Sequence, residues 1–185
     1  MMTPPERDAV LKYLADSRER LLRTMQGLSR EQLDYRASPG RWTVAENLEH
    51  LTFVEGRVLD FIQKSLNEGP TPSKNSAFEG KEKELVEDVA GRLTRFQAPE
   101  AIQPNGRWPG DQLLNQFETV RRRTREFASS TNADLRKHFF THPRFGDLDL
   151  YQWLLLIAAH CERHRAQAEE VMASPAFPKA SVAAS

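Results

Sequence analysis

The sequence predicts an all-α protein, most simply a four-helix bundle with long crossover connections. Apolar residues recur at helical spacing in four segments, and no segment of note alternates in the manner of a strand. The long middle connections suit a bundle that is not the plain up-down-up-down form. With 185 residues, the chain is long enough to bury a sizeable core. We expect one domain over residues 1–173 and a disordered tail of small and polar residues over 174–185.

The first helix is expected to begin at Thr3-Pro4-Pro5-Glu6, which has capping-box spacing and places proline at the first helical position. Gly27 stands where this helix would end. A connector follows over residues 29–40, with one short turn at SREQL. A second capping box, Thr43-Val44-Ala45-Glu46, then opens a long helix that extends to about Leu66.

The middle of the chain is less regular. Residues 81–96 predict a modest charged helix, which Gly91 weakens. Residues 98–110 carry three prolines and two glycines, so they predict a long irregular crossover of the kind that is often functional. Asp111 is expected to cap the third clear helix. The basic cluster Arg121–Arg123 with Arg125 is expected on a solvated face of that helix.

The last helix, Leu148–Met172, has one apolar stripe at about 100° per residue. His160 and His164 lie inside this stripe, one turn apart, so their Cβ atoms are about 5–6 Å from each other. Two imidazoles at this spacing could chelate one metal ion. The alternative is a pair of core histidines bonded to backbone carbonyls. A third histidine would favour the metal site.

The other histidines carry weaker signals on their own. His50 lies at the edge of the second helix's stripe, which by itself predicts a surface-edge position. His138 and His142 are also four residues apart, but His142 precedes Pro143, which disfavours a helical conformation there. That second pair therefore cannot be assumed to share a helix face.

The composition excludes several classes of protein. The 26 basic and 26 acidic residues balance, so no global field favours nucleic acid or an anionic membrane. No apolar run approaches the roughly 18 residues of a membrane span, and the N-terminal residues lack the apolar segment of a signal peptide. A single cysteine rules out an internal disulfide framework. We therefore expect a cytoplasmic protein without nucleic-acid or membrane partners.

Three motifs carry a family resemblance. The block RWTVAENLEHL at residues 41–51, followed by HPRFG at 142–146 and HCERHRAQ at 160–167, resembles the DinB/YfiT-like superfamily. The likeness covers most of residues 6–173. It implies a four-helix bundle that holds a divalent metal ion with one histidine from the second helix and two from the fourth. The matching positions here are His50, His160 and His164.

Relatives in this family include bacillithiol and mycothiol S-transferases and a mycothiol-dependent maleylpyruvate isomerase. The resemblance implies an enzyme that transfers a low-molecular-weight thiol such as bacillithiol or mycothiol to a small electrophile. Three imidazoles leave a coordination position open, as in catalytic zinc sites, and they suit Zn²⁺, Ni²⁺ or Fe²⁺. A metal-dependent hydrolase and a non-catalytic metal- or ligand-binding bundle are the alternatives. For the oligomeric state, the assembly that we consider is a homodimer of this chain.

The candidate substrate-pocket residues are Asn47, Trp153 and His142. Asn47 either orients His50, contacts substrate or makes a plain core hydrogen bond. Trp153 lies two turns before His160 and either lines the pocket or packs in the core. Cys161 falls in the apolar stripe and is expected to be a small buried hydrophobe.

Overall fold

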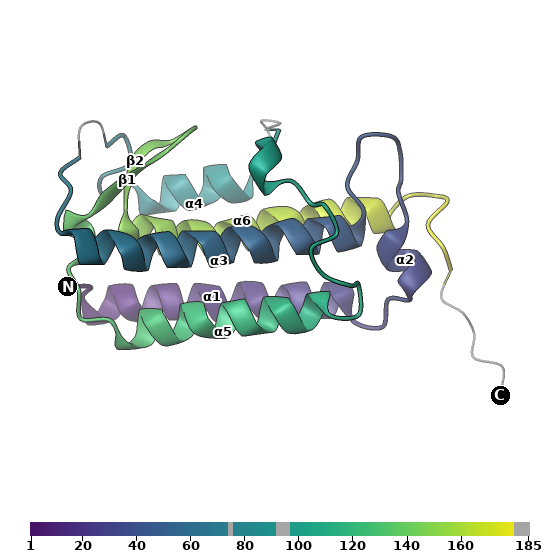
Figure 1. Cartoon of the computed structure of the whole chain (residues 1–185), viewed down its shortest axis with the longest axis horizontal. Helices are drawn as coiled ribbons and strands as arrows, with labels where there is room; N and C mark the ends of the chain where they lie inside the picture. The colour runs from purple at the N-terminus through teal and green to yellow at the C-terminus, as the bar shows by residue number, and fades with distance from the viewer. Residues whose placement is uncertain (74–75, 92–96, 180–185) are drawn as a thin grey trace.

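The computed structural model describes residues 1–73, 76–91 and 97–179, and four long helices dominate it (Figure 1). These are α1 (Pro4–Met25), α3 (Val44–Glu68), α5 (Leu113–Ser130) and α6 (Leu150–Met172). The shorter elements are α2 (Arg30–Asp34), α4 (Glu82–Ala90), the 3-10 turns η1 (Glu100–Ile102) and η2 (Leu135–Lys137), and the strands β1 (Phe139–His142) and β2 (Gly146–Asp149). The four-helix bundle predicted from helical periodicity is confirmed.

The long helices form a ring in the order α1, α6, α3, α5, in which each helix packs against the next. α1 and α6 run parallel, because the hydrogen bonds Arg20–Glu162 and Thr24–Glu169 follow one another in the same direction along both. α3 and α5 also run parallel, and this pair is antiparallel to the first (Figure 1). The connections from α1 to α3 and from α5 to α6 therefore join helices that are not neighbours in the ring. The connection from α3 to α5 joins neighbours that run parallel, so it has to return along the length of the bundle, which is why this crossover is the longest.

Side-chain caps define where three of the long helices begin. α1, α3 and α6 start with capping boxes, made by Thr3 and Glu6, Thr43 and Glu46, and Asp149 and Gln152. The prediction that Asp111 caps α5 is wrong. The N-cap position is occupied by Gln112, whose side chain makes no capping bond. Asp111 lies inside the preceding turn, which is closed by a hydrogen bond from the Gln112 N–H to the Pro109 carbonyl.

α6 is the central helix, and its first half is buried on every side. All residues from Leu150 to Ala159 are buried, where the sequence predicted a single apolar stripe. The cause is α4, which packs on α6 in addition to α1 and α3 and covers the face that the bundle leaves outside. The helix predicted over residues 81–96 is this α4, which ends at Ala90, and residues 92–96 lie outside the described part of the chain.

A β-hairpin precedes α6. β1 and β2 pair antiparallel, with Phe139 opposite Asp149 and His142 opposite Gly146. The expectation of no strand of note is therefore wrong at this point. Each strand has only four residues, too few for an alternating pattern to be visible in the sequence. The hairpin brings His142 against Trp153 near the beginning of α6, with their ring centroids 5.3 Å apart.

One charged side chain crosses the interior. Arg121 is 0% exposed and donates to Glu55, to the Leu14 carbonyl and to Ser17 Oγ. The prediction that this basic cluster lies on a solvated helix face is confirmed for Arg122, Arg123 and Arg125, which are exposed, and is wrong for Arg121. A guanidinium can occupy the core because Glu55, 1% exposed, balances its charge.

The first part of the predicted disordered tail packs on the bundle. Tyr35 hydrogen-bonds Ser174 Oγ at 2.9 Å, and its ring meets Phe177 edge-on at 5.5 Å between centroids. Gln32 donates to the Pro178 carbonyl at 2.9 Å. The prediction of disorder rested on the small and polar residues of the tail and gave no weight to Phe177, the aromatic residue that anchors this segment. Residues 180–185 lie outside the described residues. Within the described ranges, no helix has the length and apolar character needed to cross a membrane.

Candidate metal centre

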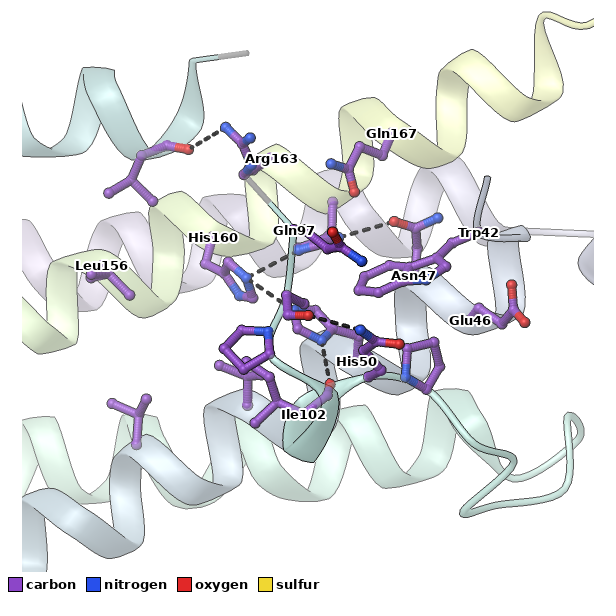
Figure 2. A pocket seen from close by; sticks show the side chains of 18 of the residues that line it. Trp42, Glu46, Asn47, His50, Gln97, Ile102, Leu156, His160, Arg163 and Gln167 are labelled. Carbon is purple, nitrogen blue, oxygen red and sulfur yellow. Dashed lines mark hydrogen bonds between the residues drawn. The ribbon is translucent and has the colours of Figure 1, made fainter. Parts of the chain in front are cut away.

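Three histidines from two helices meet in the pocket between α3 and α6. Two of them, His50 and His160, are labelled in Figure 2. His160 and His164 are one turn apart on α6, and His50 faces them from α3. His160 Nε2 lies 3.4 Å from His50 Nε2 and 3.0 Å from His164 Nε2. One ligand atom from each ring lies within 4.8 Å of the other two. The structure thus brings together the three histidines that the sequence singled out.

Fixed acceptors hold the outer nitrogens of two of these rings. His50 Nδ1 donates to the Ile102 carbonyl at 2.7 Å (Figure 2). His164 Nδ1 donates to Asn47 Oδ1 at 2.9 Å, and the Asn47 amide is oriented by its own Nδ2, which donates to the Thr43 carbonyl at 2.8 Å. Both rings therefore carry their proton on Nδ1 and direct an Nε2 lone pair towards the third ring. Asn47 orients His164 rather than His50.

This arrangement fits a divalent metal ion. Metal–nitrogen distances of about 2.0–2.1 Å in tetrahedral geometry place ligand nitrogens roughly 3.3–3.4 Å apart, close to the two separations from His160 Nε2. Without a cation, one proton on that nitrogen would have to serve two lone pairs at once. Three neutral imidazoles are also the donor set that leaves a coordination position open in catalytic zinc sites.

Burial keeps the His50 and His160 rings neutral. His50 is 3% exposed, and desolvation lowers its pKa below 6.5 although its bond to the Ile102 carbonyl acts in the opposite direction. The pKa of His160 lies well below 6.5 because the ring is desolvated and because His50 and Arg163 are nearby. The neutral imidazole is the form that binds metal, so both rings are ready for a metal ion at neutral pH.

A carboxylate anchors the crossover that supplies the Ile102 carbonyl. Glu49, 4% exposed, accepts the backbone N–H groups of Asn105, Gly106 and Arg107 at 2.8, 3.0 and 3.2 Å. The Arg107 guanidinium adds a fourth bond at 2.9 Å. Glu49 could not be singled out from the sequence, because nothing in the helical pattern distinguishes it from the solvated carboxylates of the same helix.

The histidines open into a cavity of about 1330 Å³ between α3, α6, the crossover and the hairpin. At one end Trp42 stacks on His164, with ring centroids 5.9 Å apart. Trp42 could not be singled out from the sequence, because it lies just before α3 and is not part of the periodic pattern of that helix. The three candidate pocket residues, Asn47, Trp153 and His142, all line this cavity.

The described lining offers no hydroxyl, thiol or lysine amine as a nucleophile of the protein's own, because it contains no Ser, Thr, Tyr, Cys or Lys. Cys161 is 0% exposed and packs in the core, as predicted, and burial raises the pKa of its thiol to about 11. The lining carboxylates, Glu46 and Glu170, form ion pairs with Arg36 and Arg41. Chemistry in this cavity would depend on what the histidines hold.

Fold and site together define a class of four-helix bundles that present three histidines between antiparallel helices. The sequence pattern of the DinB superfamily matches residues 13–168, and the chain belongs to this superfamily. It is 25% identical to YuaE of Bacillus subtilis (strain 168) over 148 residues, 80% of this chain and 87% of YuaE. Its fold is similar to that of YfiT from Bacillus subtilis, described as a probable metal-dependent hydrolase with an unusual four-helix bundle topology. That match has a TM-score of 0.62 and 17% identity, and it covers 93% of this chain and 89% of YfiT.

Proposed function

We propose that His50, His160 and His164 bind one divalent ion, Zn²⁺, Ni²⁺ or Fe²⁺, and that the protein is a metal-dependent enzyme acting on small molecules. The observation that carries the proposal is the convergence of three ring nitrogens, two of which belong to rings whose protons are committed elsewhere. Imidazole nitrogens favour these ions over Mg²⁺ or Ca²⁺, which prefer oxygen ligands.

The reaction that we favour is transfer of a low-molecular-weight thiol, such as bacillithiol or mycothiol, to a small electrophile. A metal ion at the three histidines supplies an open position at which a thiol or a water becomes acidic. The lack of a hydroxyl, thiol or lysine amine in the described lining supports an external nucleophile. The cavity of about 1330 Å³ is larger than the roughly 300–1,000 Å³ usual for one small ligand, which suits two reactants side by side.

Metal-dependent hydrolysis is the second candidate. YfiT, which shares the fold, is described as a probable metal-dependent hydrolase. Hydrolysis would use the same histidines with water in place of the thiol, and it would need room for only one substrate. The two reactions therefore differ in their dependence on an added thiol.

Metal-free protein reloaded separately with Zn²⁺, Ni²⁺ and Fe²⁺ tests these proposals, with bound metal measured by elemental analysis. Each form is assayed for conjugation of monochlorobimane with bacillithiol, mycothiol and glutathione, and for hydrolysis of p-nitrophenyl esters. We expect metal-dependent conjugation that His160→Ala abolishes. The matched control Cys161→Ser, one residue along but facing the core, should retain it.

Each outcome separates the alternatives. Metal-dependent ester hydrolysis without any thiol dependence would favour the hydrolase. Bound metal with neither activity would favour a bundle that binds metal or a small ligand without turnover. If the wild-type protein binds none of the three ions, the metal site itself is refuted.

A further inference from the structure

His142 offers the cavity a hydrogen-bond donor of fixed tautomer. It ends β1, and its Nδ1 accepts the backbone N–H groups of Arg144 and Phe145 at 3.1 and 3.3 Å. Because Nδ1 accepts both bonds, the proton of the neutral ring lies on Nε2. Among the described residues, Nε2 has no hydrogen-bond partner and is not enclosed, and the ring lines the cavity. This N–H group is therefore available to a ligand.

The surroundings keep the ring in that state. Burial lowers the pKa of His142 from 6.5 to about 4, and the nearby cation Arg144 acts in the same direction. At neutral pH the imidazole is uncharged, with its acceptor nitrogen already occupied by the hairpin turn. Towards the cavity, the ring can only donate.

A wall of stacked aromatic rings stands beside this donor. The Phe61 and Phe140 rings stack with centroids 3.7 Å apart, and Phe140 stacks on Trp153 at 4.6 Å. All three rings line the same cavity as the histidine cluster. Trp153 precedes His160 by seven residues on α6, which corresponds to about 10 Å of helix rise. A planar molecule of about that length would reach from the wall to the cluster.

Two of the arginines that line the cavity, Arg57 and Arg144, are close in sequence to residues of the wall. Arg57 lies one turn before Phe61 on α3 and lines the cavity. It has no carboxylate partner among the described residues, and its guanidinium carbon is 5.6 Å from the centroid of the Phe53 ring. Arg144, on the hairpin side, is paired with Asp88 at 2.5 Å. An unpaired guanidinium together with a neutral N–H donor favours an anionic oxygen over a cation.

We propose that His142 is a specificity-determining residue whose Nε2–H binds the carboxylate of a planar aromatic substrate. The aromatic group would lie against the side of this stack of Phe61, Phe140 and Trp153 that lines the cavity, and Arg57 would supply the opposite charge. This inference rests on the proposed function, because it names the substrate class of the same cavity: an aromatic carboxylate whose reacting atom lies away from the carboxylate, at the histidine cluster.

The test measures binding of 1-naphthoate and 1-naphthylmethylammonium to metal-free protein by calorimetry, so that no metal ion can bind the carboxylate. The wild type should bind naphthoate about tenfold or more tightly than the ammonium compound. His142→Asn retains an acceptor for the two turn N–H groups but places no donor at the Nε2 position. It should lose about ten- to a hundredfold in naphthoate affinity, with ammonium binding and melting temperature unchanged. Arg57→Leu, at an exposed position, should cost a few fold.

Equal binding of the two probes by the wild type, no binding of naphthoate, or unchanged naphthoate affinity in His142→Asn would overturn the inference. A purely structural role would weaken both probes together. His142→Phe keeps a ring in the wall without the donor and should also lose the preference for naphthoate. Metal content is measured on the same proteins. Naphthoate binding through His142 without any metal binding would defeat the proposed function alone, and metal binding without a naphthoate preference would defeat this inference alone.

Discussion

Asn47 illustrates, at the scale of a single residue, how a ligand ring is oriented. Its amide accepts from His164 Nδ1 and is itself fixed by the Thr43 carbonyl. Such outer partners typically contribute 10–100-fold to metal affinity. We expect Asn47→Ala to weaken metal binding by about that factor, measured by competition with a chromogenic chelator. Asn115→Ala, on the exposed side of α5, is the matched control. Equal affinities in the two variants would show that His164 needs no acceptor.

His50 shows what helical periodicity can and cannot predict about one residue. The sequence placed it at the edge of a stripe, yet the structure leaves it 3% exposed. The crossover folds over that edge and brings the Ile102 carbonyl, 52 residues away, to its ring. The i, i+4 pair on α6 was visible from the residues themselves, whereas the third histidine was identified through family resemblance. A loop that covers a helix leaves no trace in that helix's own pattern.

At the scale of elements, the anchor of the crossover should make stability depend on pH. Burial alone would raise the pKa of Glu49, but the bonds from Asn105, Arg107 and Gly106 outweigh it, and the pKa lies below 4.5. Because the pKa of Glu49 is lower in the folded state than in the unfolded state, its carboxylate stabilises the fold at every pH above the unfolded-state pKa. This stabilisation is lost as the pH falls through the folded-state pKa. Glu49→Gln should lower the free energy of unfolding by about 1–3 kcal/mol at neutral pH.

Urea unfolding of wild type and Glu49→Gln across an acid series measures this effect. The difference between them should shrink below pH 4.5, the unfolded reference value. Glu84→Gln, at an exposed position on α4, should show little difference from wild type at any pH. A gap that persists unchanged into strong acid would mean that the charge of Glu49 is not what anchors the crossover.

The Arg121–Glu55 pair links elements through the core. The guanidinium connects α5 to α3 and also to the Leu14 carbonyl and Ser17 hydroxyl of α1. Arg121→Met would leave a buried carboxylate without its partner and should destabilise the fold by about 3–5 kcal/mol. The double variant Arg121→Met with Glu55→Leu should recover much of that loss, as chemical denaturation can show. A double variant no more stable than the single one would mean that packing, not charge, dominates here.

For the whole molecule, metal binding should adjust stability without creating the fold. Two clusters of buried apolar residues extend over the four long helices, independently of the histidines. An ion at 100 times its dissociation constant adds about 2.7 kcal/mol, or roughly 5–10 °C in melting temperature for a domain of this size. Chelation should lower the melting temperature by about that amount and leave the helical circular dichroism at 25 °C largely intact. Loss of most of the helical signal would contradict this.

The bundle could be predicted from sequence because four long stripes of helical period need one another to be buried. Its ring order could not, because periodicity says that a face is buried but not which helix covers it. The same limit explains α6, whose first half is also buried on the face that the other long helices leave uncovered, because α4 packs on it. It also explains why Arg121 was predicted on a solvated helix face. The sequence of α5 does not reveal that Glu55 of α3 pairs with Arg121 in the core.

The position of α6 in chain order has a consequence for biosynthesis. This helix packs on α1, α3 and α4, yet it is the last long helix to leave the ribosome. Until residues 150–172 have emerged, the faces of α1, α3 and α4 that pack on α6 have no cover, and His50 has no partner rings. The nascent chain therefore has to be kept from aggregating while these apolar faces are exposed, and the three histidines could share one ion only after α6 has docked.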